Sequence, residues 1–312
     1  FYFVYDLRVL PSNFEFLSAL GIAEHKRKKA ALKKLACIFV MPEEGSIYDL
    51  SRSSLSEQSS KEEKSNHWFL TNVLIDSLSL LPSCDGGALS LNSEAALELL
   101  KNIPTENKYI SSKNLLNPFF ENFGPYFWQL ARDFPEDAHP FEASETAKIF
   151  VSQWIKVNGL DGQKFIVINF RESKNYQARN TNLKTWLEVA DLLEALGYKV
   201  VIVRDTYAAF DYKQEFLGRL IFNEAAWNLQ LRTAIYELAF CVVGGNNGPL
   251  QLAIQNRKVS YIHFFKFIEE GTVFETSREY FSSQGIEVGE SYAAALDDQH
   301  FVWGDTDNAS FV

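Results

Sequence analysis

The sequence has few of the residues that build disulfide-linked or zinc-binding domains. Its 312 residues include 3 cysteines and 5 histidines. Cys37, Cys84 and Cys241 are too few and too widely spaced for a disulfide framework or a zinc site, and the histidines lack metal-ligand spacing. We therefore expect no metal and no other cofactor, and a reducing, cytoplasmic setting.

Long apolar runs and an excess of positive charge are also absent. No stretch approaches the ~18 consecutive apolar residues of a membrane-spanning helix. We therefore expect no transmembrane segment and at most peripheral association with a membrane. The formal net charge is −10, which argues against a nucleic-acid partner because phosphate contacts dominate that kind of binding. The basic run at 25–29 is local and typical of a solvated helix face.

Three common catalytic signatures are missing as well. The sequence contains no GxSxG, no Walker GxxxxGK[ST] and no GxGxxG after a predicted strand. These absences disfavour a hydrolase of that type, a P-loop NTPase and a standard dinucleotide dehydrogenase. The length is sufficient for two domains of ordinary size.

The second half of the chain alternates between strand and helix signals. Apolar runs predict buried strands at 165–170, 200–203, 240–243 and 259–264. Apolar residues recur with the helical period from 183 to 196, where Asn182 can cap the helix and Gly197 can end it. Further helices are predicted at 146–157 and 229–238. This alternation predicts a parallel, doubly wound α/β sheet.

The first half repeats the alternation less regularly. Strands are predicted at 2–7, 35–41 and 87–91, helices at 13–29, 68–80 and 93–102, and a mobile loop at 51–66. The stretch 117–140 is rich in proline and aromatic residues and shows no clear period. We place a domain boundary near 140–160, which gives an N-terminal Rossmann-like domain at 1–145 and a C-terminal one at 146–312.

The loop after the strand at 240–243 carries the clearest functional signal. It reads Gly244-Gly245-Asn246-Asn247-Gly248-Pro249 and leads into an apolar, helix-compatible run. Glycines let the backbone turn sharply and approach a ligand, and proline suits the first position of a helix. The N–H groups at a helix start bind anions such as phosphate. An ordinary strand-to-helix turn remains the alternative interpretation.

Other polar residues follow the neighbouring strands of the second half. Ligands of open parallel sheets bind beyond the carboxyl ends of the strands, where the candidate ligand-binding residues Arg171, Arg179 and Asp205 lie. Asn228 and Arg232, one helical turn apart just before the strand at 240–243, could face the same rim, and His263 ends the last strand as a candidate catalytic residue. Arginine suits bidentate phosphate contact, and Asp205 could accept from ribose hydroxyls or a base edge. The alternatives are an Arg171–Asp205 salt bridge, an exposed helix face for Asn228 and Arg232, and a core position for His263.

Residues 160–265 resemble the donor-binding domain of GT-B glycosyltransferases, in particular the heptosyltransferase-like and fucosyltransferase-like members. The heptosyltransferase-like loop Asp-(Ser/Thr)-Gly-Pro-Met-His-Leu-Ala is similar to residues 246–253, where Asn246 and Gln251 replace its Asp and His. The resemblance extends to Arg179, Trp186, the run VVIVRD at 200–205, and Arg232 ahead of Tyr-Glu-Leu-Ala at 236–239.

The resemblance implies two Rossmann-like domains facing a cleft, with a tail at 302–305 that crosses back toward the first. It implies metal-independent, inverting transfer of a sugar from a nucleotide-diphosphate sugar to a glycan or lipid-linked acceptor, as in polysaccharide biosynthesis. The second domain would bind the donor, and Arg171, Arg179 and the helix at Pro249 would stabilise the leaving diphosphate.

An inverting enzyme also needs a general base from the first domain. Asp6, at the end of the first strand, is the candidate, with Glu15 and Glu24 as alternatives. Two other functions remain open. One is a GT-B-fold nucleotide-sugar epimerase, although the chain offers few acid/base groups for it. The other is a non-catalytic nucleotide-sugar-binding or scaffold protein, which Asn246 and Gln251 make plausible.

Overall fold

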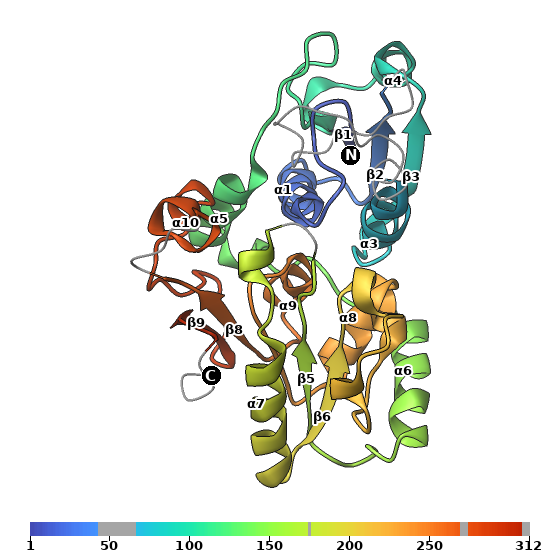
Figure 1. Ribbon diagram of the computed structural model, residues 1–312. Coiled ribbons are helices and arrows are strands. Elements are labelled where there is room, and N and C mark those ends of the chain that lie inside the picture. The colour runs from blue at the N-terminus through green and yellow to red at the C-terminus, as the bar shows by residue number, and fades with distance from the viewer. Residues whose placement is uncertain (43–66, 174–175, 269–273, 308–312) are drawn as a thin grey trace. The chain divides into compact units, whose positions relative to one another are not determined.

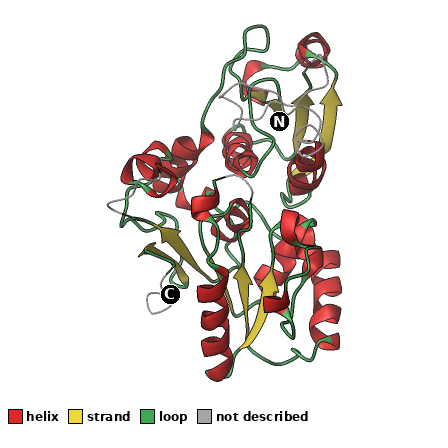
Figure 2. Ribbon diagram, viewed as in Figure 1, coloured by secondary structure: helices red, strands yellow, loops and turns green. Residues whose placement is uncertain are grey.

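The computed structural model describes residues 1–42, 67–173, 176–268 and 274–307 (Figure 1). The loop predicted at 51–66 lies outside these residues. Contacts between Cα atoms divide the chain into two compact units, residues 1–140 and 141–312. In both units strands and helices alternate along the chain, as Figure 2 shows. The predicted α/β fold class, with two parallel sheets, is confirmed.

The first unit is built on a 4-stranded parallel sheet with the order β3-β2-β1-β4. The strands are β1 Tyr2–Asp6, β2 Leu35–Val40, β3 Cys84–Ser90 and β4 Lys108–Ile110. The helices are α1 Glu15–Lys29, the π-helical η2 Leu70–Ile75, α3 Asp76–Leu78, α4 Ser93–Leu100 and α5 Phe123–Asp133, with short 3-10 turns η3 Thr105–Asn107 and η4 Pro135–Asp137. The strand β4 and the helix α5 were not anticipated from the sequence.

The second unit is built on a 5-stranded parallel sheet with the order β6-β5-β7-β8-β9. Its strands are β5 Phe165–Asn169, β6 Lys199–Val203, β7 Cys241–Gly244, β8 Tyr261–Lys266 and β9 Gln299–Gly304. Its α-helices are α6 Glu145–Val157, α7 Leu183–Ala195, α8 Leu229–Leu238, α9 Gln251–Ile254 and α10 Arg278–Ser283. Its 3-10 turns are η5 Gln177–Arg179, η6 Thr206–Ala208, η7 Gln214–Phe216, η8 Asn223–Ala226, η9 Gly248–Leu250 and η10 Phe274–Thr276.

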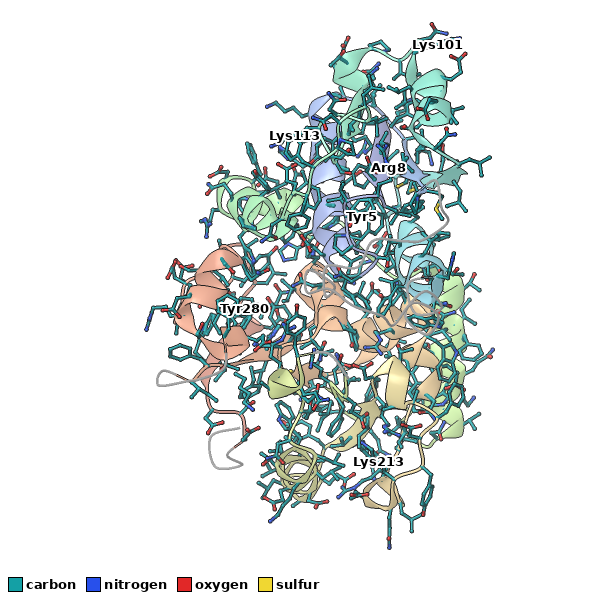
Figure 3. The ribbon with its side chains drawn as sticks, turned by 45° about the horizontal axis from the view of Figure 1, so that its top comes forward. Tyr5, Arg8, Lys101, Lys113, Lys213 and Tyr280 are labelled. Atoms are coloured by element: carbon teal, nitrogen blue, oxygen red, sulfur yellow. The ribbon has the colours of Figure 1, made fainter. Side chains whose placement is uncertain are left out.

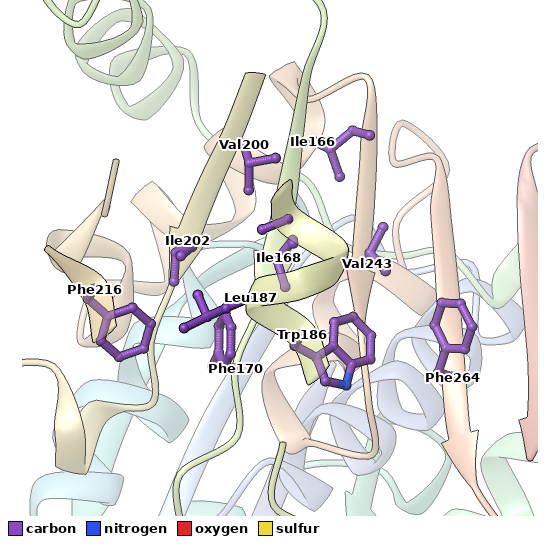
Figure 4. Close-up of a cluster of buried hydrophobic side chains, with 11 residues drawn as sticks. Ile166, Ile168, Phe170, Trp186, Leu187, Val200, Ile202, Phe216, Val243 and Phe264 are labelled. Atoms are coloured by element: carbon purple, nitrogen blue, oxygen red, sulfur yellow. The ribbon is translucent and has the colours of Figure 1, made fainter. Parts of the chain in front are cut away.

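The helix α7 shows why the second half could be interpreted from its sequence. The Asn182 side chain accepts from the Thr185 N–H at 3.3 Å, and Gly197 follows the helix with φ +93°. Glycine is favoured at a positive φ because it has no Cβ that would clash with the backbone. The apolar stripe of α7 packs on the sheet in a buried cluster with Ile166, Ile168, Phe170, Val200, Ile202, Phe216, Val243 and Phe264 (Figure 4). Replacing the buried Trp186 of this stripe by alanine would cost about 3–5 kcal/mol.

The end of the chain corrects one expectation. Residues 302–305 were expected to cross back toward the first unit, but Val302, Trp303 and Gly304 belong to β9. They pair in parallel with Phe264, Phe265 and Lys266 of β8. The Trp303 ring stacks on Phe265 with centroids 4.4 Å apart. Backbone pairing and aromatic packing therefore hold this segment in the second sheet.

Candidate functional site

The loop Gly245–Pro249 leaves the carboxyl end of β7, as predicted, and Asn247 organises its second half. The Asn247 Oδ1 accepts from the Leu250 N–H at 3.0 Å and from Asn169 Nδ2 at 3.0 Å. It thereby caps the 3-10 turn η9, in which Pro249 occupies the first turn. The expected helix is short, because η9 continues only into the four residues of α9. A helix of this length contributes little macrodipole, so the loop's own polar groups matter more.

Close packing explains the glycine that precedes this loop. A Cβ on Gly244 would lie 3.0 Å from the Asn169 carbonyl oxygen and 3.0 Å from Leu250 Cδ1. Any side chain at this position would push the loop away from the end of β5. Gly244 is therefore required for the turn to sit against the neighbouring strand.

Asn246 is the least satisfied polar side chain of the loop. It is 6% exposed, and neither its Oδ1 nor its Nδ2 has a hydrogen-bond partner in the described part of the chain. The Nδ2 of Asn247 is likewise buried without an acceptor there. A buried polar group that makes no hydrogen bond costs about 1–3 kcal/mol. The loop thus holds hydrogen-bonding capacity that the described residues do not use and that a polar ligand could use.

Two arginines lie at the carboxyl end of β5. Arg171 is buried and donates from Nη1 to the Tyr176 carbonyl at 2.9 Å and to Asn180 Oδ1. Burial, and then the positive charge of Arg179, lowers the pKa of Arg171 to about 10, while the nearby Asp205 acts in the opposite direction. The group remains a cation at neutral pH. Asp205 also accepts from the Glu172 N–H at 3.3 Å.

Arg232 does not face an open rim, which corrects both interpretations made from the sequence. It is 1% exposed and donates to the carbonyls of Ala225 at 2.6 Å and Arg204 at 3.2 Å. Its Nη1 also donates to Asn169 Oδ1 at 3.1 Å. Since Asn169 in turn donates to Asn247, a buried relay runs from Arg232 to the β7 loop. Arg232 therefore supports the loop from within the fold and is not available to a ligand.

Asn169 was missed by the sequence analysis, although a signal was present. It is a fully buried amide at the end of the otherwise apolar strand β5. A polar residue in such a run indicates a specific hydrogen-bonding role. Asn228 is also structural, because its Oδ1 accepts from the Leu231 N–H at 2.9 Å and caps α8.

A second buried network lies at the end of β6. Arg204 forms two hydrogen bonds with the Glu172 carboxylate, at 2.9 and 2.7 Å, and Lys213 contacts the same carboxylate at 2.5 Å. These cations, with hydrogen bonds, hold the pKa of Glu172 below its usual value although burial opposes them. Glu172 thereby joins the loop after β5 to the loop after β6.

His263 occupies a core position, as the alternative interpretation expected. Its ring stacks on Phe265 with centroids 4.2 Å apart, and burial lowers its pKa to about 3. Neither ring nitrogen has a hydrogen-bond partner among the described residues. The histidine is therefore neutral at physiological pH and is not a candidate acid or base.

In the first unit, Asp6 lies at the carboxyl end of β1 as predicted, but both of its oxygens are engaged. Oδ1 accepts from Arg8 Nε at 2.9 Å and from the Arg8 N–H at 3.2 Å. Oδ2 accepts from Arg8 Nη2 and from Ser112 Oγ, each at 2.8 Å. Figure 3 labels Arg8. The fully buried Asp6 thus fixes the loops that follow β1 and β4.

Glu15, in the first turn of α1, has a different environment. Burial raises its pKa to about 6, against the opposing effect of a hydrogen bond from the Phe123 N–H at 3.0 Å. Within the described residues it forms no ion pair. Glu24, the other alternative, is buried and engaged by Arg27 and Ser83. Glu15 is therefore the candidate carboxylate with the most capacity for proton transfer near neutral pH.

The described residues contain no group of three or more His, Cys, Asp or Glu side chains that could hold a metal ion. In the same part of the chain, no helix combines the length and apolar character needed to cross a bilayer.

Comparison with known proteins supports the fold. No model of a known protein family matches the sequence, and no curated protein matches it. A glycosyl transferase of family 9 from Veillonella parvula has a similar structure, with a TM-score of 0.53 and 12% identity over 98% of this chain and 86% of that chain. The ADP-heptose LPS heptosyltransferase II of E. coli gives a TM-score of 0.49 and 12% identity over 86% of this chain and 85% of that chain.

The two parallel sheets and the first of these similarities define a protein with a GT-B-like fold. The GT-B-like fold that the resemblance of residues 160–265 implied is confirmed.

Proposed function

We propose that this protein is a metal-independent glycosyltransferase that moves a sugar from a nucleotide-diphosphate sugar to a glycan or lipid-linked acceptor. The observation that carries the proposal is the buried Asn246 amide, which has no hydrogen-bond partner among the described residues. It lies beyond the carboxyl end of β7, where open parallel sheets bind ligands. The GT-B-like fold supplies the context for this chemistry.

The donor diphosphate would be bound by the second unit, residues 141–312. Asn246 can donate from its amide, and Arg171 and Arg179 supply positive charge at the end of the neighbouring strand β5. Both arginines are partly or fully buried, where charge interactions are stronger than in water. Such fixed charges favour the extra negative charge that a leaving nucleoside diphosphate acquires in the transition state.

In the first unit, the proposed general base is Glu15 rather than Asp6. A base works best when its pKa is near the working pH, and the pKa of Glu15 is about 6. Its carboxylate would take the proton of an acceptor hydroxyl as that oxygen attacks the anomeric carbon. The bond from this carbon to the diphosphate oxygen breaks, and the sugar is transferred with inversion.

One observation favours a second candidate, a protein that binds nucleotide sugars without transferring them. Arg8 and Ser112 engage both oxygens of Asp6, so the carboxylate at the end of β1 is not available as a base. Asn246 and Gln251, which stand where the heptosyltransferase-like loop has Asp and His, also favour binding without transfer. Both candidate functions include binding of the nucleotide-sugar donor, but only the first includes transfer of the sugar.

A thermal-shift screen with ADP, GDP, UDP, CMP and their sugars tests donor binding, with and without EDTA. A ligand at 100 times its dissociation constant adds about 2.7 kcal/mol of stability, so at least one diphosphate should raise the melting temperature, also in EDTA. Absence of any shift would contradict the proposal, and a shift lost on chelation would contradict metal independence. Acceptors are then added to the protein and its donor. Release of nucleoside diphosphate would indicate a transferase, and its absence a protein that only binds the donor.

A further inference from the structure

Arg179 lies close to two tyrosine rings. Its guanidinium carbon lies 5.1 Å from the Tyr176 ring centroid and 5.3 Å from that of Tyr280. Its Nη1 donates a hydrogen bond to the Tyr280 hydroxyl at 2.7 Å. Figure 3 labels Tyr280 on α10, more than a hundred residues along the chain from Arg179. The two rings and the hydrogen bond from Nη1 thus fix the position of the Arg179 side chain.

The opposite edge of this guanidinium is uncommitted. The Nε of Arg179 is buried, and no described residue accepts a hydrogen bond from it. Within the described part of the chain, the bond to Tyr280 is the one side-chain hydrogen bond of Arg179. The Nε–H and one Nη2–H of a guanidinium point to the same side and form the fork that binds phosphate or carboxylate with two parallel bonds.

Tyr280 is itself firmly positioned. The Ser277 hydroxyl accepts from the Tyr280 N–H at 3.3 Å and caps α10. The neighbouring Phe281 is buried and packs edge-on against Phe265, at 5.6 Å, and Trp303, at 5.0 Å. These contacts anchor α10 to β8 and β9. Burial raises the pKa of the Tyr280 phenol, so its oxygen stays neutral and can accept from Arg179 at physiological pH.

We propose that Tyr280 is a positioning residue that turns the Nε–Nη2 edge of Arg179 toward the donor diphosphate. The inference rests on the proposed function and deepens it, because it assigns one edge of one guanidinium to the diphosphate. The loss of the Tyr280 hydroxyl frees Nη1, and the guanidinium then rotates among several orientations. Binding of the diphosphate weakens, while binding of the base and ribose does not change.

The test compares Tyr280→Phe with wild type in calorimetric titrations with pyrophosphate, with ADP, GDP and UDP, and with adenosine, guanosine and uridine. The control is Tyr198→Phe, since Tyr198 stacks on Phe240 just before β6 and its hydroxyl makes no hydrogen bond to any residue that the structure describes. We expect Tyr280→Phe to raise the dissociation constants of pyrophosphate and of the bound nucleoside diphosphate about tenfold, as for one charge-assisted hydrogen bond. Nucleoside binding and the control should stay at wild-type values.

A second comparison uses Arg179→Lys, which removes the fork and keeps the charge. If Tyr280 acts through Arg179, adding Tyr280→Phe to Arg179→Lys weakens diphosphate binding no further. Unchanged diphosphate binding in Tyr280→Phe, or an equal loss for nucleosides and diphosphates, would overturn the inference and leave donor binding intact. If wild type binds none of the three diphosphates, the proposed function fails and the inference fails with it.

Discussion

The carboxyl ends of the two sheets differ in how their polar side chains are used. In the first unit, both Asp6 oxygens accept hydrogen bonds from residues of the fold. In the second unit, the Asn246 amide and the Arg179 Nε are buried without partners among the described residues. Folding alone does not favour buried polar groups of the second kind. We therefore infer that Asp6 stabilises the structure, whereas Asn246 and Arg179, unlike the core residue His263, are held for a polar ligand.

The largest expected effect concerns the base. Glu15→Gln keeps the acceptor for the Phe123 N–H but cannot take a proton, so the rate of sugar transfer should fall by about 10²–10⁴-fold. Donor affinity should be unchanged. Steady-state kinetics with the donor identified by the thermal-shift screen measure the effect. Asp6→Asn is the matched variant and should lower the melting temperature, because Arg8 loses its charged partner. Full activity of Glu15→Gln would exclude it as the base.

Arg232→Met should have the largest effect on stability. It leaves the carbonyls of Ala225 and Arg204 and the Asn169 Oδ1 without this donor, and each loss costs about 1–3 kcal/mol. We expect the free energy of unfolding in urea to fall by about 3 kcal/mol or more. An unchanged free energy of unfolding would show that Arg232 is not the support for the β7 loop that its contacts indicate.

The two arginines after β5 should separate binding from stability. Arg179→Ala should weaken diphosphate binding by about 1.5–3 kcal/mol with little change in melting temperature. Arg171→Ala should lower both, because Arg171 also holds Tyr176 and Asn180 of its own loop. Calorimetric binding and circular dichroism melts measure the two quantities. Identical melting temperatures for the two variants would contradict this division.

The smallest expected effect is on the pH dependence of stability. The pKa of Glu15 is raised from 4.5 to about 6 in the folded protein, so the folded state binds this proton more tightly than the unfolded state. The contribution to stability is full below pH 4.5 and is lost as the pH rises through 6, by about 1–2 kcal/mol. As the pH rises from 4.5 to 7, the free energy of unfolding of Glu15→Gln should therefore increase by this amount relative to that of wild type. A constant difference across that range would show that the pKa is not raised.

The sequence was most informative where one local pattern determines structure. The 3.6-residue period, Asn182 and Gly197 were sufficient to predict α7, and the turn at Gly244–Pro249 was recognisable from its glycines. The three-residue strand β4 is too short to show a period, and α5 lies in the stretch rich in proline and aromatic residues.

The roles of single side chains depended on partners far away in the chain. Asp6 was a reasonable base until Ser112, 106 residues later, was seen to share its carboxylate. Arg232 was expected to face the rim of the sheet, but it is buried and donates to acceptors in three other segments of the chain, Asn169 of β5, Arg204 and Ala225. No local pattern marks Tyr280, because its significance arises from its contact with Arg179, 101 residues earlier.

We propose that the β7 loop keeps unused hydrogen-bonding groups because it binds a nucleoside diphosphate. Asn246→Ala tests this most directly, with the dissociation constant measured on folded protein and the melting temperature measured alongside. We predict that the affinity for the diphosphate falls at least about tenfold, as for a lost hydrogen bond to a charged group, while the melting temperature stays the same or rises. A lower melting temperature with unchanged affinity would show that Asn246 stabilises the loop and does not bind the diphosphate.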